Sequence, residues 1–305
     1  MPASSLSSRH LRVGLALASL GSVAFSGKAI IVKLAYRYDV DAVTLIMYRM
    51  LFALPIFLLI SWWAGRGKPP LSRQDQWAVI GLGFVGYYLA SYLDFAGLNY
   101  ISASLERLIL YLNPTLVLLL AWVMYRKPIG RREAMGMMIS YSGVVLVFGH
   151  EIHLEGAGTL IGSLLVFGSA LSYAVYLSFS AELVKRLGSM RLVGLATSVA
   201  CVFCLLQFLL LRPLSAANVE MPVIWLSVLN AIACTATPVV MVMMAIERIG
   251  PSLTAQTGMV GPLATIFLGV VLLGEPFTAF LVAGSVLVIA GVFVVSTGRR
   301  EAKPA

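Results

Sequence analysis

Six ionisable residues lie inside long apolar stretches of the sequence: Lys28, Lys33, Arg49, Asp94, Glu106 and Arg107. A charge at the depth of a bilayer costs a few kcal/mol or more, so such residues are candidates for binding a substrate or a proton. Lys33 and Asp94 stand near the expected ends of their segments, where side chains can extend to the membrane surface. A structural role is therefore favoured for these two, whereas Lys28 stands midway along its segment and has no such escape.

Four bases against two acids leave surplus positive charge in this set, which would suit a substrate carboxylate. The alternative is an internal ion-pair network, such as Lys28 or Arg49 with Glu106, that only holds helices together. For Lys28 and Glu106 the sequence supports both roles equally, and for Arg49 it favours the structural role. Glu106 is expected to be the deep acid, so a coupled proton would pass through it.

Polar side chains at helical spacing form a second set of candidates. Residues three or four apart share one helix face, and this spacing groups tyrosine, serine and amide side chains into stripes. Apolar walls with a few such groups suit a planar amphipathic solute, although packing alone is an equal alternative. The residues predicted to line a cavity are Tyr88, Tyr92, Tyr111, Tyr173, Tyr176 and Gln256.

Motifs typical of enzymes occur in the wrong context. The GxGxxG pattern at residues 81–86 needs a preceding strand, but it stands inside an apolar segment. The three histidines (His10, His150 and His153) fall in expected tails or loops, and Cys201 and Cys204 form a CxxC within an apolar segment without a second pair. The sequence therefore predicts no cofactor, no metal and no ATP-binding loop. It gives little support to the alternative of a membrane enzyme acting on a lipid.

The composition requires a membrane environment for these residues. The chain has 305 residues, of which 60% are hydrophobic and 11% charged, against roughly 45–50% and 25% in soluble proteins. A spanning helix needs about 20 apolar residues. We predict ten such helices at residues 12–36, 41–64, 76–98, 102–124, 132–149, 157–182, 189–211, 221–246, 251–273 and 277–297.

The distribution of basic residues predicts how these helices are oriented. With the N-terminus in the cytoplasm, sixteen of the 22 Lys and Arg residues fall in cytoplasmic segments and two in external loops. This asymmetry follows the positive-inside rule and places both termini in the cytoplasm. The net charge of +9 is therefore explained by topology, and binding to nucleic acid is not expected.

An offset of 148 residues reveals an internal repeat. It superimposes Pro114 on Pro262, Gly136 on Gly284 and Gly143 on Gly291. The repeat spans 13–148 and 161–296, and because each copy holds five helices the second must be inverted in the membrane. The basic Lys127 accordingly aligns with the acidic Glu275. Inverted repeats are the architecture of alternating-access transporters, with Pro114 and Pro262 as candidate hinges.

These features resemble the drug/metabolite transporter superfamily, specifically its ten-helix EamA-type exporters. The resemblance rests on the repeat, on Gly274-Glu275-Pro276 followed by Gly284 and residues 289–292, and on Arg49 within the second segment. The first copy departs from it with Arg126-Lys127-Pro128, which the inversion explains. The tyrosine-rich third segment is similar to that of the aromatic amino acid exporters in this family.

The resemblance implies an all-α integral membrane protein of one domain, residues 1–305, in the bacterial inner membrane. Its function would be export of small metabolites, with aromatic amino acids first, and the alternative is a multidrug or other metabolite exporter of the same fold. The expected partners are a small-molecule substrate and membrane lipid, with protons as the candidate coupling ion. A monomer or weak oligomer is expected.

Overall fold

The computed structural model describes residues 8–126, 128–155, 157–258 and 260–301. Within these ranges the protein is helical throughout and contains no strand, as the sequence predicts for an all-α membrane protein. The elements in chain order are α1 (Ser8–Tyr36), α2 (Ala42–Gly65), α3 (Arg73–Gly83), η1 (Phe84–Leu89), α4 (Ala90–Gly97), α5 (Ala103–Leu110), α6 (Asn113–Tyr125), α7 (Arg131–Glu155), α8 (Gly158–Leu187), α9 (Ser189–Leu211), η2 (Leu214–Ala217), α10 (Met221–Ala231), η3 (Ile232–Ala236), α11 (Thr237–Thr257), α12 (Val260–Leu268), η4 (Gly269–Leu273) and α13 (Ala279–Glu301).

The helices are long and apolar enough for a bilayer. Among the described residues, eight helices qualify as spans by length and composition, and two shorter apolar helices follow at Val260–Leu273 and Ala279–Val295. Large apolar side chains cover their outer surface, as Leu210 with 81% and Phe267 with 65% exposure illustrate. A surface of this kind is stable against lipid and would aggregate in water.

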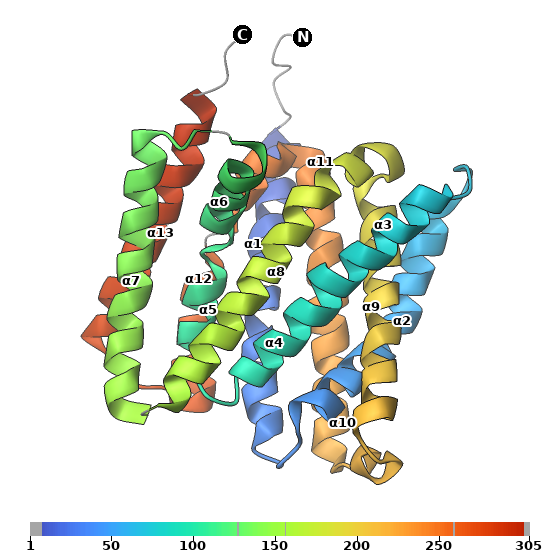
Figure 1. Ribbon diagram of the computed structural model, residues 1–305, viewed down its shortest axis with the longest axis horizontal. Coiled ribbons are helices and arrows are strands. Elements are labelled where there is room, and N and C mark those ends of the chain that lie inside the picture. Colours follow the sequence, from blue (N-terminus) through green and yellow to red (C-terminus); the bar gives the residue numbers. More distant parts are fainter. Residues whose placement is uncertain (1–7, 127, 156, 259, 302–305) are drawn as a thin grey trace.

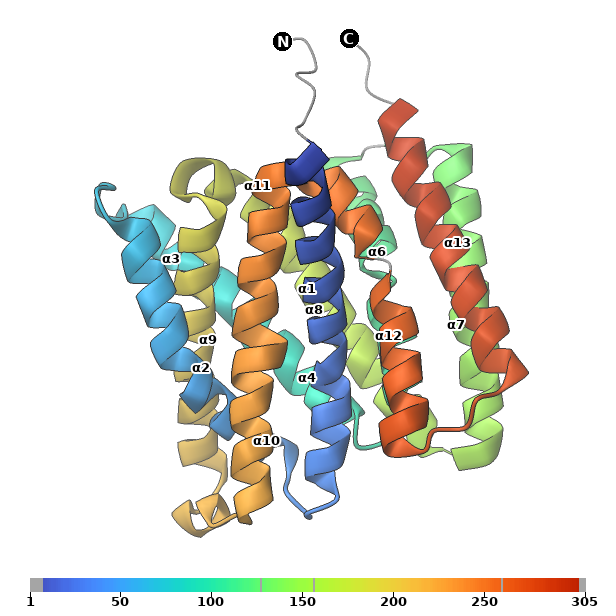
Figure 2. The same cartoon turned by 180° about the vertical axis from the view of Figure 1, so that it is seen from behind.

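The helices form a bundle whose two edges are paired helices. In Figures 1 and 2, α7 runs beside α13 at one edge and α2 beside α9 at the other, while α1 packs on α11 between them. The start of α1 and the end of α13 lie at the same end of the bundle. We call this the terminal end, and the opposite one the far end.

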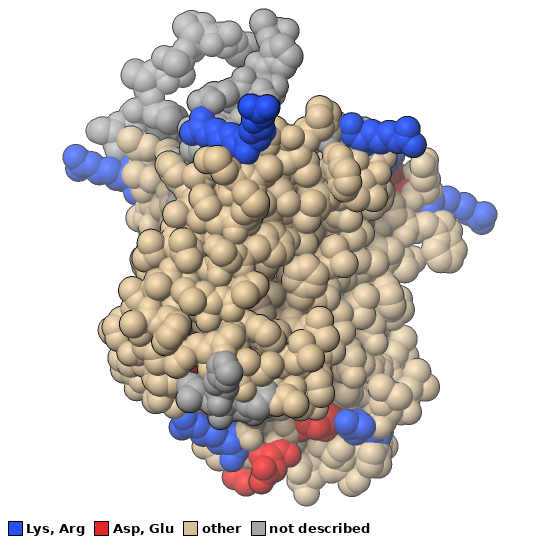
Figure 3. All heavy atoms as spheres, turned by 60° about the vertical axis from the view of Figure 1, so that its left-hand side comes forward, with Lys and Arg blue, Asp and Glu red and all other residues tan. Residues whose placement is uncertain are grey.

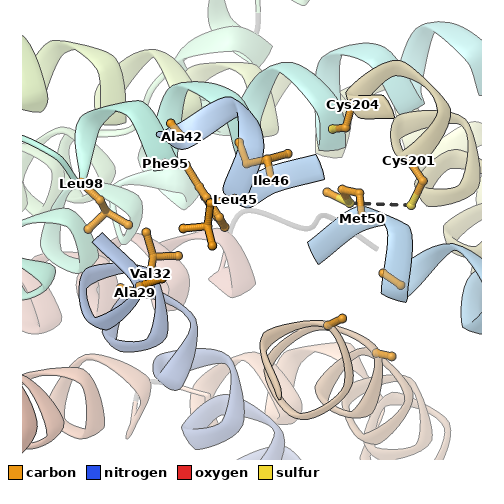
Figure 4. Close-up of a cluster of buried hydrophobic side chains, with 14 of the residues drawn as sticks. Ala29, Val32, Ala42, Leu45, Ile46, Met50, Phe95, Leu98, Cys201 and Cys204 are labelled. Atoms are coloured by element: carbon orange, nitrogen blue, oxygen red, sulfur yellow. Dashed lines mark hydrogen bonds between the residues drawn. The ribbon is translucent and has the colours of Figure 1, made fainter. Parts of the chain in front are cut away.

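The main apolar core joins α1, α2, α4 and α9. Figure 4 shows Leu45, Ile46 and Met50 of α2 between side chains of α1 and α9. The sulfur of Cys201 lies 3.7 Å from that of Met50, and all three cysteines are buried and free. The CxxC pair therefore takes part in packing, as predicted, because Cys201 and Cys204 both belong to the buried apolar core.

Glycines allow α7 and α13 to pack backbone against backbone. A Cβ atom added to Gly136 would lie 2.7 Å from the carbonyl oxygen of Gly291, and one added to Gly143 would lie 2.6 Å from that of Gly284. Small residues let membrane helices approach closely, and van der Waals contact then holds them together. Under the 148-residue offset Gly136 aligns with Gly284 and Gly143 aligns with Gly291. Each glycine of α7 therefore packs against the α13 glycine that aligns with the other one.

Several helices are interrupted within the bundle. Segments η1 and η3 are π-helical turns that start at Phe84 and Ile232, 148 residues apart. The helical path also breaks after Leu110, before α6, and after Thr257, before α12. Pro114 and Pro262 lie in the first turn of the helix that follows each break, where a missing N–H is tolerated. These proline side chains follow the breaks and do not kink an uninterrupted helix.

One predicted boundary is wrong. The sequence predicts that one helix ends at residue 246 and the next begins at residue 251, but α11 continues to Thr257. The chain then breaks at Gly258, whose amide still bonds the carbonyl of Thr254 at 2.9 Å. Pro251 lacks the N–H that would bond the carbonyl four residues earlier, yet the helix continues past it for six more residues, so this proline does not end the helix.

Charged side chains lie at the two ends of the surface that Figure 3 shows. Lys and Arg gather at the terminal end, a wide belt without charge follows, and Asp and Glu lie at the far end together with a few Lys and Arg. The uncharged belt matches the hydrocarbon layer of a bilayer, whose polar interfaces would lie at the charged ends.

Candidate functional site

Three helices bring a cluster of opposite charges together inside the bundle. The ammonium of Lys28 in α1 lies 2.5 Å from Oδ2 of Asp94 in α4 and 3.2 Å from Oε1 of Glu106 in α5. Asp94 is 2% and Glu106 0% exposed. Charges at this depth are tolerable only when paired, and one cation here faces two carboxylates. The pairing of Lys28 with Glu106 is the ion pair that the sequence offers as one alternative.

The prediction that Asp94 extends to the membrane surface is wrong. Asp94 is buried, and the chain around it is fixed by the hydroxyl of Tyr36, which donates to the carbonyl of Phe95 at 2.6 Å. Lys33 agrees with its predicted structural role, since its ammonium donates to the carbonyls of Leu98 and Ile101. These carbonyls lie just beyond the end of α4, where a cation is favoured.

Two guanidinium groups near the cluster have no acidic partner within ion-pair distance among the described residues. Arg49 is 7% exposed; its Nε donates to the hydroxyl of Thr235 at 3.2 Å, and its guanidinium lies 5.1 Å from the centre of the Phe95 ring. Its Nη1 is buried without a hydrogen-bond partner. Arg107 donates through Nη2 to Ser26 at 3.0 Å, and its Nε is buried without a partner.

These residues border a central cavity of about 390 Å³. Its lining includes Lys28, Arg49, Asp94 and Arg107 and comes from both halves of the chain. The lining extends to Val193, near the start of α9, so the cavity lies toward the terminal end of the bundle.

The predicted tyrosines divide between the cavity and the packing around it. Tyr111 and Tyr173 line the cavity, and the hydroxyl of Tyr111 donates to the carbonyl of Gly258 at 2.6 Å. This hydrogen bond joins the helix break after Leu110 to the helix break after Thr257. Tyr176 is buried beside the cavity, with its hydroxyl 3.3 Å from that of Tyr87.

Tyr88 and Tyr92 are not among the residues that line this cavity. Tyr88 packs against Phe84 and Phe203, and Tyr92 packs against the apolar core. Glu106 lies behind the lining, in contact with Lys28. Gln256 belongs to α11, but its side chain lies outside the described part of the structure.

Sequence reasoning missed Tyr87, Asp94 and Thr197 as lining residues. Tyr87, Ser91 and Asp94 follow the same helical spacing as the predicted pair Tyr88 and Tyr92, one residue earlier. Spacing identifies a stripe but does not say which of two adjacent stripes faces inward.

A second cavity of about 550 Å³ opens at the far end, where Lys33, Arg37, His150 and Glu275 contribute to its lining. Glu275 accepts hydrogen bonds from the amides of Ala103 (2.6 Å) and Ser104 (3.2 Å) and from the Ser104 hydroxyl (2.6 Å). A carboxylate at a helix N-terminus interacts favourably with the unpaired amides and the helix dipole. Glu275 thereby fastens the loop before α13 to the start of α5.

The charge cluster separates the two cavities. Lys28 and Asp94 line the central cavity, and Ser104, two residues from Glu106, lines the far one. A polar solute in the central cavity therefore meets Lys28 and Asp94 directly, whereas one in the far cavity could reach the cluster only if the contacts around Ser104 opened.

The fold and the site together define a class of protein, the helical membrane proteins with a polar cavity between their two halves. The EamA-like transporter family matches residues 12–149 and, a second time, residues 160–297. The protein belongs to this family, and it is an integral membrane protein of the transporter class. The two matches begin at residues 12 and 160 and end at 149 and 297, so both limits are 148 residues apart.

Similar proteins have names of the same kind. The chain is 30% identical over 304 residues to a Bacillus subtilis protein named uncharacterized transporter YcbK, with 97% of this chain and 95% of that protein covered. It is 23% identical over 292 residues to an uncharacterized transporter of Archaeoglobus fulgidus, covering 93% and 98%. A solved structure described as "Crystal structure of protein" shares the fold with a TM-score of 0.62 and 16% identity, covering 94% of this chain and 98% of that one.

Proposed function

We propose that the protein is a secondary transporter that exports small metabolites, first among them amino acids with aromatic side chains, by alternating access. The observation that carries the proposal is the central cavity, whose lining comes from both halves and ends at the Lys28 cluster. Tyr87 and Tyr173 supply an aromatic wall for a planar side chain. Multidrug or other metabolite export by the same fold is the second candidate, because the apolar walls suit such solutes as well.

The architecture we propose has ten crossings in two inverted repeats of five, with both termini in the cytoplasm. Matching π-helical turns, matching helix breaks and the double family match support the repeat. The crossed glycine contacts between α7 and α13 support inversion, because equivalent helices meet in this way only when they run antiparallel. The common end of α1 and α13 supports an even number of crossings.

The contacts of Glu275 join the loop before α13 to the start of α5 at the far end. We propose that they form an external gate that must break before substrate leaves. In the aligned loop of the first copy the sequence has Lys127, which lies outside the described residues. A cation would be repelled by a helix N-terminus, so an equivalent closure is not expected at the cytoplasmic end.

Protons are the proposed coupling ion. Lys28, Asp94 and Glu106 carry a net charge of −1 when all three are ionised, so one added proton makes the cluster neutral, and such clusters are typical of proton relays in membranes. The protein would work in the bacterial inner membrane as a monomer or weak oligomer, without a cofactor and without catalysing a reaction.

The purified protein in liposomes tests this function. Vesicles loaded with radiolabelled phenylalanine, with and without a proton gradient, should release label faster than protein-free vesicles, and an excess of unlabelled substrate should compete. Release that stays at the protein-free rate for every standard amino acid would contradict amino acid export. A pH-dependent rate that survives Glu106→Gln would rule out Glu106 as the proton path.

A further inference from the structure

We infer that the central cavity recognises a zwitterion, with Arg49 binding the carboxylate and Asp94 binding the protonated amine of the substrate. The inference rests on the proposed function and adds which residues distinguish an amino acid from its amine or acid analogue. It assigns substrate recognition to two residues for which the sequence favours structural roles.

The charge of Lys28 is already neutralised by Asp94 and Glu106. Its ammonium contacts two carboxylates, at 2.5 Å and 3.2 Å, so it has little attraction left for a third. The surplus positive charge of the site therefore resides on Arg49 and Arg107, which form no ion pair with any described residue.

Two residues that line the cavity each have a buried polar atom without a hydrogen-bond partner. Nη1 of Arg49 is a buried donor without a partner, and Oδ1 of Asp94 is a buried acceptor without one. Both residues line the cavity, one on α2 and one on α4. An unpaired buried polar atom is unfavourable, and a ligand with an anionic and a cationic group would satisfy both atoms.

Arg49 and Asp94 border the same wall. The Arg49 guanidinium lies 5.1 Å from the ring of Phe95, and Phe95 follows Asp94 directly along α4. Arg49 therefore contacts the residue next to Asp94, and an α-amino acid carries on one carbon the anionic and cationic groups that these two residues would bind. A simple anion would satisfy only one of them.

The internal repeat provides a control on structural necessity. Under the 148-residue offset Arg49 aligns with Thr197, and Asp94 aligns with Val242. Both uncharged residues line the same cavity from the other half. Because the second copy packs at these positions without a charge, the fold itself does not require Arg49 and Asp94 to be charged.

Three related solutes test the inference: phenylalanine, phenethylamine without the carboxylate, and 3-phenylpropionate without the amine. Their binding to the purified protein is measured by competition with radiolabelled phenylalanine. We expect the wild-type protein to prefer phenylalanine over each analogue by about tenfold or more, as for a missing partner at a buried charged group. Equal binding of phenylalanine and phenethylamine by the wild-type protein would overturn the inference without any variant.

Two substitutions then separate the roles of the residues. Arg49→Gln should reduce the preference over phenethylamine only, and Asp94→Asn the preference over 3-phenylpropionate only. Arg66→Gln is the matched control, because Arg66 caps the end of the same helix and stacks on Trp62 at 3.8 Å outside the cavity. It should leave both preferences unchanged.

The outcomes distinguish this inference from the proposed function. If phenylalanine is exported but both variants keep the wild-type preferences, or lose affinity for all three solutes equally, the residues are structural and the inference fails alone. If the protein transports other solutes and binds no standard amino acid, the zwitterion assignment and the amino acid proposal both fail, whereas the transporter class stands.

Discussion

Lys28 is the residue on which the stability of the buried site depends most. Its ammonium is the ion-pair partner of two carboxylates that are almost completely shielded from solvent. The net contribution of such a cluster is small when it is complete, because desolvation offsets the attraction between the charges. Removal of the single cation is different, since two acids would then remain buried without compensation.

We therefore expect Lys28→Met to lower the free energy of unfolding by about 3–5 kcal/mol. Thermal unfolding in detergent measures the change. Lys185→Met is the matched control, because that lysine is 77% exposed and pairs with Glu182 at 3.6 Å on the surface; its effect should stay below about 0.5 kcal/mol. Combining Lys28→Met with Asp94→Asn and Glu106→Gln should restore much of the loss. A combined variant as unstable as the single one would contradict this explanation.

Asp41 gives the structure a local pH dependence outside the membrane segments. Partial burial raises the pKa of its carboxyl, but hydrogen bonds from Thr44 and the charge of Arg212 lower it by more, and the net pKa is below the ordinary value. The carboxylate accepts from the amides of Val43 and Thr44 at the start of α2 and pairs with Arg212 at 3.1 Å. A depressed pKa contributes stability above the unfolded-state pKa, and the contribution is lost as the pH falls through the folded one.

Asp41→Asn should therefore lower the melting temperature slightly and equally from pH 7 to about pH 5, with the difference shrinking below about pH 4. The effect should be small because the ion pair is exposed. Asp41→Ala also removes the helix cap and should cost about 1 kcal/mol more. A difference between wild type and Asp41→Asn that grows with acid would show that the carboxyl has the opposite shift.

At the residue scale the sequence predicts part of the site. It offers Lys28 with Glu106 as one possible ion pair, because Lys28 stands midway along its apolar segment and Glu106 is expected to be the deep acid. It favours a structural role for Asp94 because this residue stands near the end of its predicted segment, but the packing of α4 against α8 and α2 and the ion pair with Lys28 bury the carboxylate. The choice between the stripes of Tyr87 and Tyr88 depends on helix rotation, which a single sequence does not contain.

Interrupted helices are the main feature at the scale of elements. The π-helical turns and the two breaks expose backbone groups inside the bundle, and the Tyr111 hydroxyl satisfies one of them at Gly258. Non-helical backbone at this depth is tolerated where it lies within protein or borders a cavity. The sequence predicts the order of the helices from hydropathy, but the π turns leave no signal in composition and are visible only in the structure.

The glycine contacts between α7 and α13 give a prediction at this scale. Gly143→Ala would place a Cβ atom 2.6 Å from the carbonyl of Gly284, so the helices must separate. We expect a loss of about 1–3 kcal/mol in the free energy of unfolding. Gly149→Ala in the same helix is the control, since its Cβ would have nothing within 4 Å and should be neutral or stabilising. Equal effects of the two substitutions would contradict close packing at Gly143.

At the scale of the whole molecule, the proposed alternating access makes the central cavity toward the terminal end and the Glu275 contacts at the far end features of one of two states. In this state Ser104 is 2% exposed, whereas Val242 lines the cavity and is partly accessible. Alternating access requires a second state in which these accessibilities are exchanged. All four charged residues of the cavity lining, Lys28, Arg49, Asp94 and Arg107, come from the first half, so the two states need not be equally populated.

The most direct test measures the accessibility of positions 104 and 242 in a protein whose native cysteines have been replaced. Cys201, Cys204 and Cys234 are replaced, Ser104→Cys and Val242→Cys are introduced separately, and a membrane-impermeant thiol reagent is applied from each side of oriented vesicles. We expect labelling of the Ser104→Cys variant only from outside and of the Val242→Cys variant only from inside, with substrate changing the two rates in opposite directions. Labelling of both positions from one side, or rates that rise and fall together, would contradict alternating access.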